Sequence, residues 1–137
     1  GVVIAETFAR PLVVAGGFYK RFRDSGALPG SRLRCWLLRA LTNRLFGDQA
    51  IFVKRDVLEN CGGVPDVPLM EEFELCKTIA SHGRISLASA TVLTSARKFR
   101  EEGMLRTYWR MARCTLRYWL GASPEKLVEI YYPQVGK

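Results

Sequence analysis

The chain has 137 residues, of which 48% are hydrophobic and 25% charged, and its formal net charge is +8. This length and composition predict one globular domain with a core and exclude a disordered protein. No apolar run approaches the ~20 residues that a membrane-spanning helix needs, so no such helix is predicted. The strong positive charge favours an anionic partner, which is a nucleotide, a phospholipid surface or nucleic acid.

The N-terminal sequence carries no basic leader before its apolar run, so we expect no signal peptide. The chain does not begin with Met, and we therefore expect a fragment or a processed product. Its cysteines are far apart and form no CxxC pair, which favours reduced thiols over disulfides or zinc ligands: Cys35, Cys61, Cys76 and Cys114. His82 lies at a predicted helix end, where a cation suits the helix dipole, so we favour this role over metal ligation.

In the first half of the chain, residues 1–11 fit either a strand or a helix until Arg10-Pro11 breaks the pattern. A strand is predicted over Leu12–Phe22, in which Gly16-Gly17 marks a bulge or a close backbone approach. A loop is predicted at 24–30, and Ser31 is the expected N-cap of a helix that ends near Leu45, before Gly47. The apolar face of that helix consists of Leu33, Trp36, Leu37, Ala40, Leu41 and Leu45.

In the second half, Gln49–Lys54 predicts a buried strand, and Asp56 is the expected cap of a short helix that Gly62 closes. A helix with an acidic first turn is predicted over 70–81. Strands over 84–88 and 91–95, a long helix over 103–120 and a last helix from Ser123-Pro124 follow. This alternation predicts the α/β class with a mixed sheet flanked by helices, and α+β is the alternative.

Five segments then occur in one order: Gly47–Arg55, Gly62-Gly63, Pro65–Glu72, Gly83-Arg84 and Thr94–Lys98. As an ordered set they resemble the C-terminal part of family 2 glycosyltransferases, and most closely the small branch described as glycosyltransferase-like. The resemblance covers roughly residues 12–131. It implies the acceptor-binding half of a GT-A fold, so that residues 1–137 form one partial domain with a sheet-and-helix acceptor region at 12–100 and a C-terminal amphipathic helical segment at 101–137.

The resemblance places Glu72 where inverting members of the family hold the general base. Such a base is needed because a sugar hydroxyl is a poor nucleophile until a positioned carboxylate takes its proton. The family usually has Glu-Asp at this helix start, whereas this chain has Glu71-Glu72. Acids in a first helical turn also stabilise the helix dipole without any catalysis, which is the alternative interpretation of the pair.

Five more residues are implied in binding the acceptor or the diphosphate, and Glu71, beside the candidate base, is one of them. Asp48 and Gln49 would line the cleft, and their alternative interpretation is the turn chemistry of a helix-to-strand connection. Arg97 and Lys98 correspond to a flexible loop whose cations neutralise the diphosphate. Their alternative is a solvated basic surface.

The family holds a divalent metal, Mg or Mn, with a DxD motif that this sequence lacks. We therefore expect the metal only with a donor half outside this chain, and none bound by this chain alone. Two functions follow. The chain is part of an enzyme that transfers a sugar from a nucleotide-diphosphate donor to a hydroxyl acceptor, or it is a non-catalytic, shortened relative that serves as a structural subunit of a larger, organellar assembly.

In either case another polypeptide segment would cover the missing half. The expected location is the cytoplasm or an organelle stroma or matrix, with a peripheral position at a membrane as an option. The predicted helix over 103–120 bears on that option, because a basic stripe of Arg106, Arg110, Arg113 and Arg117 runs beside its apolar residues, which are Leu105, Tyr108, Trp109, Ala112, Leu116, Trp119 and Leu120.

This pattern suits a helix in an anionic lipid interface. It also suits a helix that packs its apolar face on the sheet and leaves its arginines in solvent, and we favour this arrangement. Arginines between aromatic residues also contact nucleic acid, but no recognised motif supports that third interpretation.

Overall fold

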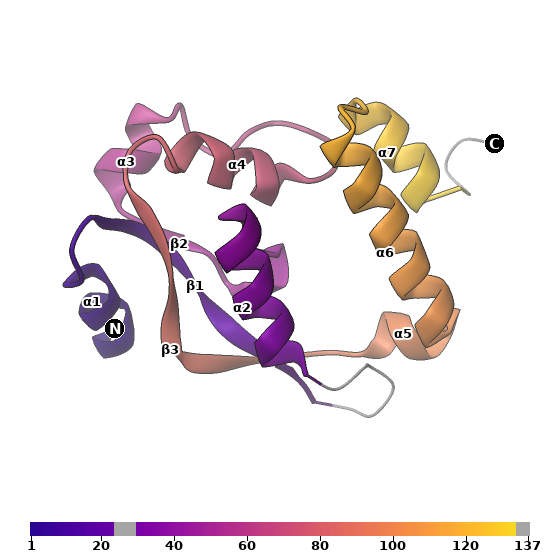
Figure 1. Ribbon diagram of the computed structural model, residues 1–137, viewed down its shortest axis with the longest axis horizontal. Coiled ribbons are helices and arrows are strands. Elements are labelled where there is room, and N and C mark those ends of the chain that lie inside the picture. The colour runs from indigo at the N-terminus through magenta and orange to yellow at the C-terminus, as the bar shows by residue number, and fades with distance from the viewer. Residues whose placement is uncertain (24–29, 134–137) are drawn as a thin grey trace.

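The computed structural model describes residues 1–23 and 30–133, so the predicted loop at 24–30 lies almost entirely outside the described residues. Helices and a small mixed sheet confirm the predicted class (Figure 1). The elements are α1 (Val2–Phe8), β1 (Val13–Phe22), α2 (Ser31–Thr42), the 3-10 turn η1 (Gly47–Gln49), β2 (Phe52–Val53), α3 (Arg55–Asn60), α4 (Glu71–Ile79), β3 (Arg84–Thr94), α5 (Arg97–Glu102), α6 (Met104–Trp119) and α7 (Pro124–Tyr131).

The sheet has the strand order β2-β1-β3, with β1 antiparallel to β2 and parallel to β3. β3 is one strand where two were predicted. A register shift after Ala88 leaves Ser89-Ala90 without partners on β1, and pairing resumes at Thr91. Gly16 marks a close approach and not a bulge. A Cβ there would lie 2.6 Å from both the Phe52 ring and the Ser86 carbonyl oxygen.

Several predicted boundaries were wrong for local reasons. Gly30, and not Ser31, is the N-cap of α2, since the Ser31 hydroxyl donates instead to the Lys20 carbonyl oxygen at 2.7 Å. The helix ends at Thr42 because Asn43 turns to a left-handed conformation at φ 54°. The strand predicted over 49–54 shortens to two residues because the chain first forms η1.

Among the other elements, some differ from the prediction and others agree with it. The cap of α3 is Lys54 and not Asp56, which lies in the first turn of the helix. The ambiguous N-terminal segment is a helix, and the segment from Arg97 is the helix α5 instead of a loop. The predicted start of α7 is confirmed, because the Ser123 hydroxyl accepts a hydrogen bond from the Lys126 N–H.

The main core lies between the sheet and helices α3 and α4, and it also includes one residue of the chain after α2. Its buried members are Ala15, Leu45, Val57, Leu75, Cys76, Ile79, Ile85 and Leu87. All four cysteines are free thiols, as predicted, and three of them are buried. This core fixes the start of α4 beside η1, which is where the candidate site lies.

Helix α6 does not lie on the sheet as we favoured. It packs mainly against α5 and α7, and Figure 1 shows α2 between it and the sheet. The side that these helices cover carries Thr107 and Cys114, which are both buried. The predicted apolar stripe, including Leu105 and Trp109, is therefore left exposed.

Candidate functional site

Glu72 lies at the start of α4, directly opposite η1. Met70 adopts a left-handed conformation at φ 64°, which turns the chain sharply into the helix. Gly47 then faces the Glu72 carboxyl group, and a Cβ on Gly47 would lie 3.7 Å from its Cδ atom. The fold thus brings together the glycine of one predicted motif and the carboxylate of another.

The surroundings of Glu72 raise the pKa of its carboxyl group above the usual 4.5. Burial is the main cause, and the negative charges of Glu71 and Asp48 add to it. The backbone N–H groups of Glu72 and Gly47 oppose the shift because they favour the charged form. A half-buried carboxyl group with a raised pKa is a stronger proton acceptor once it is ionised, which is the property a general base requires.

Asp48 forms an ion pair with Lys20, which was not predicted from the sequence as a site residue. The ammonium group of Lys20, on β1, lies 2.9 Å from Asp48 Oδ2 and 4.5 Å from the centre of the Phe46 ring. Lys20 is only 5% exposed. The sequence did contain a signal for this ion pair. Lys20 follows the apolar and aromatic residues of a strand, and a lysine that is buried in a strand needs a counter-charge.

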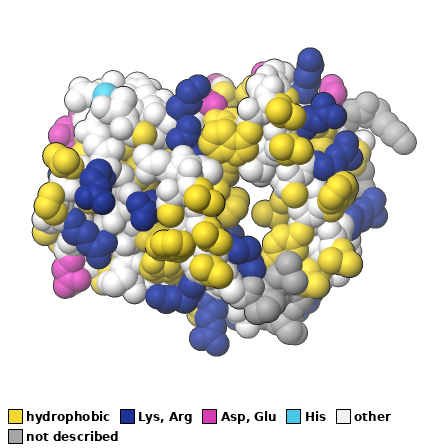
Figure 2. All heavy atoms as spheres, in the orientation of Figure 1, with side chains coloured by type: hydrophobic (Ala, Val, Ile, Leu, Met, Phe, Trp, Pro, Cys, Tyr) yellow, Lys and Arg dark blue, Asp and Glu magenta, His cyan; other side chains and the backbone are white. Residues whose placement is uncertain are grey.

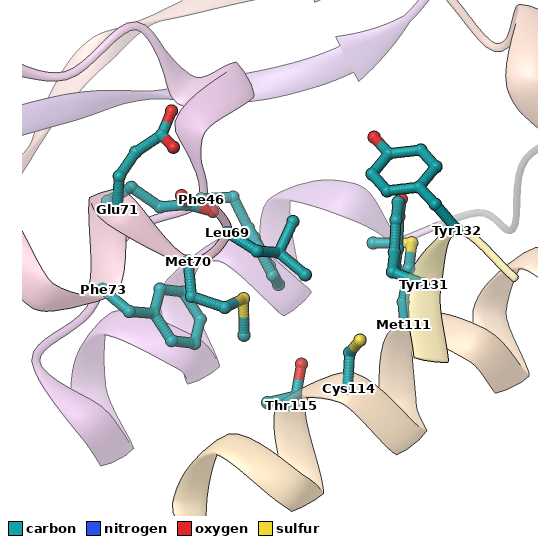
Figure 3. Close-up of a pocket in the computed structure, with 11 residues that line it drawn as sticks. Phe46, Leu69, Met70, Glu71, Phe73, Met111, Cys114, Thr115, Tyr131 and Tyr132 are labelled. Atoms are coloured by element: carbon teal, nitrogen blue, oxygen red, sulfur yellow. The ribbon is translucent and has the colours of Figure 1, made fainter. Parts of the chain in front are cut away.

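Two adjoining cavities open beside these residues. The smaller one, of about 210 Å³, lies between α4, α6 and α7 and is lined by both Glu71 and Glu72. In Figure 3, Met70 and Phe73 lie on one side of it, Cys114 and Thr115 on another, and Tyr131 and Tyr132 close its far end.

The larger cavity measures about 710 Å³ and lies between α2 and α6, where Figure 2 shows a hollow. Its wall is mostly apolar, but it includes the Lys20–Asp48 pair and Lys98. The two cavities are adjacent, because they share four lining residues, which are Phe46, Met111, Thr115 and Tyr131.

The remaining predicted site residues do not all line the two cavities. Gln49 is fully buried, where its side chain accepts from the Phe46 N–H at 2.8 Å and donates to the Phe18 carbonyl oxygen at 3.1 Å. It therefore holds η1 against β1 instead of facing the cleft.

Arg97 and Lys98 belong to α5, and a helix replaces the flexible loop that the resemblance implied. Arg97 is exposed and pairs with Glu101 at 3.6 Å, so it lies outside both cavities. Lys98 lines the larger cavity, with its ammonium group 3.8 Å from the centre of the Tyr131 ring. Only one of the two predicted cations is thus placed to meet an anion in the cleft.

The site residues do not fit a metal centre of their own. Within residues 1–23 and 30–133, no three His, Cys, Asp or Glu side chains are grouped to hold an ion. Asp48, whose carboxylate could otherwise serve as a ligand, already has Lys20 as its partner. A metal that comes with a donor half stays a prediction.

Within the described part of the chain, none of the helices is both long enough and apolar enough to cross a membrane. Comparisons with protein-family models, with curated proteins and with solved structures produced no match to this chain. The resemblance to glycosyltransferases therefore stays a prediction from the ordered sequence motifs.

Proposed function

We propose that this chain forms the acceptor side of a glycosyltransferase site, of GT-A type, with Glu72 as the general base. The observation that carries the proposal is the Glu72 carboxyl group itself. It is half-buried, has a raised pKa, rests against Gly47 and lines a cavity that lies next to a larger one. Stabilisation of the helix dipole does not explain the burial of this carboxyl group, because an exposed acid would stabilise the dipole equally well.

In the proposed reaction, the acceptor hydroxyl oxygen attacks the anomeric carbon of the donor sugar. The hydroxyl proton passes to the Glu72 carboxylate, and the bond from the anomeric carbon to the diphosphate oxygen breaks, so that the diphosphate leaves with the electron pair. A base in this position contributes about 10²–10⁴-fold to the rate. Lys98 lies on the cleft wall, where its charge favours an anionic leaving group.

The test is Glu72→Gln in the protein that contains this chain together with its donor-binding part. We expect kcat for transfer of a labelled sugar from a nucleotide-sugar donor to fall at least about 10²-fold. The KM of the donor should change little, because Gln keeps the shape of the side chain. The acid limb of the pH–rate profile should also disappear, because it reports the titration of the base.

Glu59→Gln is the matched control, since Glu59 is exposed on α3 and the substitution removes the same charge. Equal activity of the two variants would rule out Glu72 as the base.

The alternative function, a structural subunit without catalysis, is favoured by one observation. Large apolar side chains on α2 and α6, among them Trp36 and Leu105, are exposed, and such patches mark interaction surfaces. Size-exclusion chromatography with an apolar dye tests this alternative. A stable monomer that binds no dye would count against it.

A further inference from the structure

One face of α2 presents an apolar stripe to solvent. Its members lie at positions i, i+3, i+4 and i+8, which places them on a single side of the helix: Leu33, Trp36, Leu37 and Leu41. Leu41 is 79% exposed, whereas Cys35 on the opposite side is fully buried. The apolar face predicted for this helix therefore exists, but it points outward.

A second stripe runs along α6 and onto the residue after it. Its exposed members are Leu105, Trp109, Leu116, Trp119 and Leu120, again at helical spacing. Trp109 is 69% exposed, although it is among the largest apolar side chains in the protein. Burial of such residues is the usual outcome in a water-soluble domain, so two exposed stripes indicate a partner.

The two stripes meet around the opening of the larger cavity. Leu37 from α2, together with Leu116 and Trp119 from α6, is exposed and also lines that cavity. Figure 2 shows apolar side chains over α2 and along α6 on the same face of the molecule, with Lys and Arg side chains among them. One flat partner can therefore contact both helices at once.

The charges on these helices are of one sign. α2 has three arginines and α6 has four, and neither helix contains an Asp or a Glu. Arg106, Arg113 and Arg117 are exposed directly beside the α6 stripe. This pattern selects an anionic partner, in agreement with the net charge of +8.

We propose that α2 and α6 bind the surface of an anionic lipid bilayer, with their exposed leucines and tryptophans in the interface and their exposed arginines at the headgroups. The leucine-rich stripes favour lipid over nucleic acid, which would contact stacking aromatic residues and phosphate-binding groups instead. Tryptophan is also the side chain that membrane interfaces enrich. The binding surface lies on α2 and α6 and does not depend on Glu72.

The experiment is flotation of the purified chain with phosphatidylcholine vesicles, with and without phosphatidylglycerol. We expect binding only to the anionic vesicles, weaker binding in high salt, and a blue shift of tryptophan emission. Leu116→Ser should weaken partitioning roughly tenfold, because one leucine no longer leaves water. Arg113→Glu with Arg117→Glu should abolish the preference for phosphatidylglycerol.

Val64→Ser is the control for Leu116→Ser, because both side chains are 60% exposed but Val64 lies outside both helices. Far-UV circular dichroism checks that each variant is folded, and Glu72→Gln should bind vesicles like the unmodified chain. Absence of vesicle binding, equal binding to both vesicle types, or equal effects of the Leu116 and Val64 variants would overturn the proposal. So would a dimer in which both stripes are covered, or tighter binding to single-stranded RNA.

Discussion

Lys20 and Asp48 form an ion pair across 28 residues of sequence, with the lysine Nζ 3.0 Å from Oδ1 and 2.9 Å from Oδ2. The lysine side chain is buried and the aspartate side chain is partly open to solvent. The pair fastens the central strand of the sheet to η1, the turn that presents Gly47 to Glu72. It therefore positions the candidate base as well as stabilising the fold.

Asp48→Asn should destabilise the protein because it leaves the Lys20 ammonium buried without a counter-charge. We expect the free energy of unfolding in urea to fall by about 2 kcal/mol, less than for a fully buried pair because Asp48 is partly solvated. The double variant with Lys20→Met should regain part of the loss. Asp66→Asn, at an exposed position, is the control, and an equally small effect at both sites would contradict the structural role of the pair.

Glu72 should make the stability of the protein depend on pH in an unusual direction. Its pKa is raised in the folded state, mainly by burial, so the folded protein holds the proton more tightly than the unfolded chain does. Stability should therefore fall as pH rises from below 4.5 through the folded-state pKa. A carboxyl group that only served the helix dipole would give the opposite slope.

Glu72→Gln removes this titration. Thermal unfolding across this pH range should show the variant gaining stability relative to the unmodified chain as pH rises, with no further gain once Glu72 is fully ionised. Glu59→Gln, at an exposed position on α3, is the control for the loss of one carboxylate charge. A stability difference between the Glu72→Gln variant and the unmodified chain that does not change with pH would contradict a raised pKa.

Gly16 is where the packing of the sheet can be tested most directly. The Cβ of Gly16→Ala would lie 2.6 Å from the Ser86 carbonyl oxygen, so the backbone of the neighbouring strand would have to shift. We expect a loss of about 1–3 kcal/mol in urea unfolding. Gly1→Ala, which meets nothing within 4 Å, should leave stability unchanged. A neutral Gly16→Ala variant would mean that β1 and β3 are less closely packed.

Local sequence signals predicted those elements whose limits are set by neighbouring residues in the chain. The β-branched and aromatic residues of β1 indicated nearly its full extent, and Ser123-Pro124 marked the start of α7. The end of α2 was missed because Asn43, and not a glycine, takes the left-handed conformation. Helical periodicity correctly placed the apolar sides of α2 and α6, but it carries no information on what covers them.

The candidate site was predictable only in part, because it is built from contacts distant in sequence. Glu72 stood out through its motif, yet its raised pKa arises mainly from burial in the folded protein, where Gly47 of η1, 25 positions earlier in the chain, lies against its carboxyl group. Lys20 was missed because a lysine in a strand usually lies at the surface. Gln49 has the polarity of a binding residue, but its hydrogen bonds are with the backbone of β1 and η1.

Tyr118 joins α6 to α4 through one hydrogen bond. Its hydroxyl group donates to Glu74 Oε1 at 2.5 Å, and its ring packs edge-on against Phe73 at 5.6 Å between centres. Burial, followed by the hydrogen bond and charge of Glu74, raises the pKa of Tyr118 to about 12. This contact helps to set the width of the cavity that Glu72 and Phe73 line.

Tyr118→Phe removes the hydrogen bond and keeps the ring, so we expect a loss of about 1 kcal/mol in urea unfolding at neutral pH. Because the folded-state pKa is raised, this stabilisation is fully present below pH 10 and is lost as pH rises toward 12. Titration of tyrosinate absorbance should show one late step near pH 12 that Tyr118→Phe abolishes. Tyr132→Phe, at an exposed position, should leave that step in place. If the late step survives in the Tyr118→Phe variant, the link between α6 and α4 does not form as described.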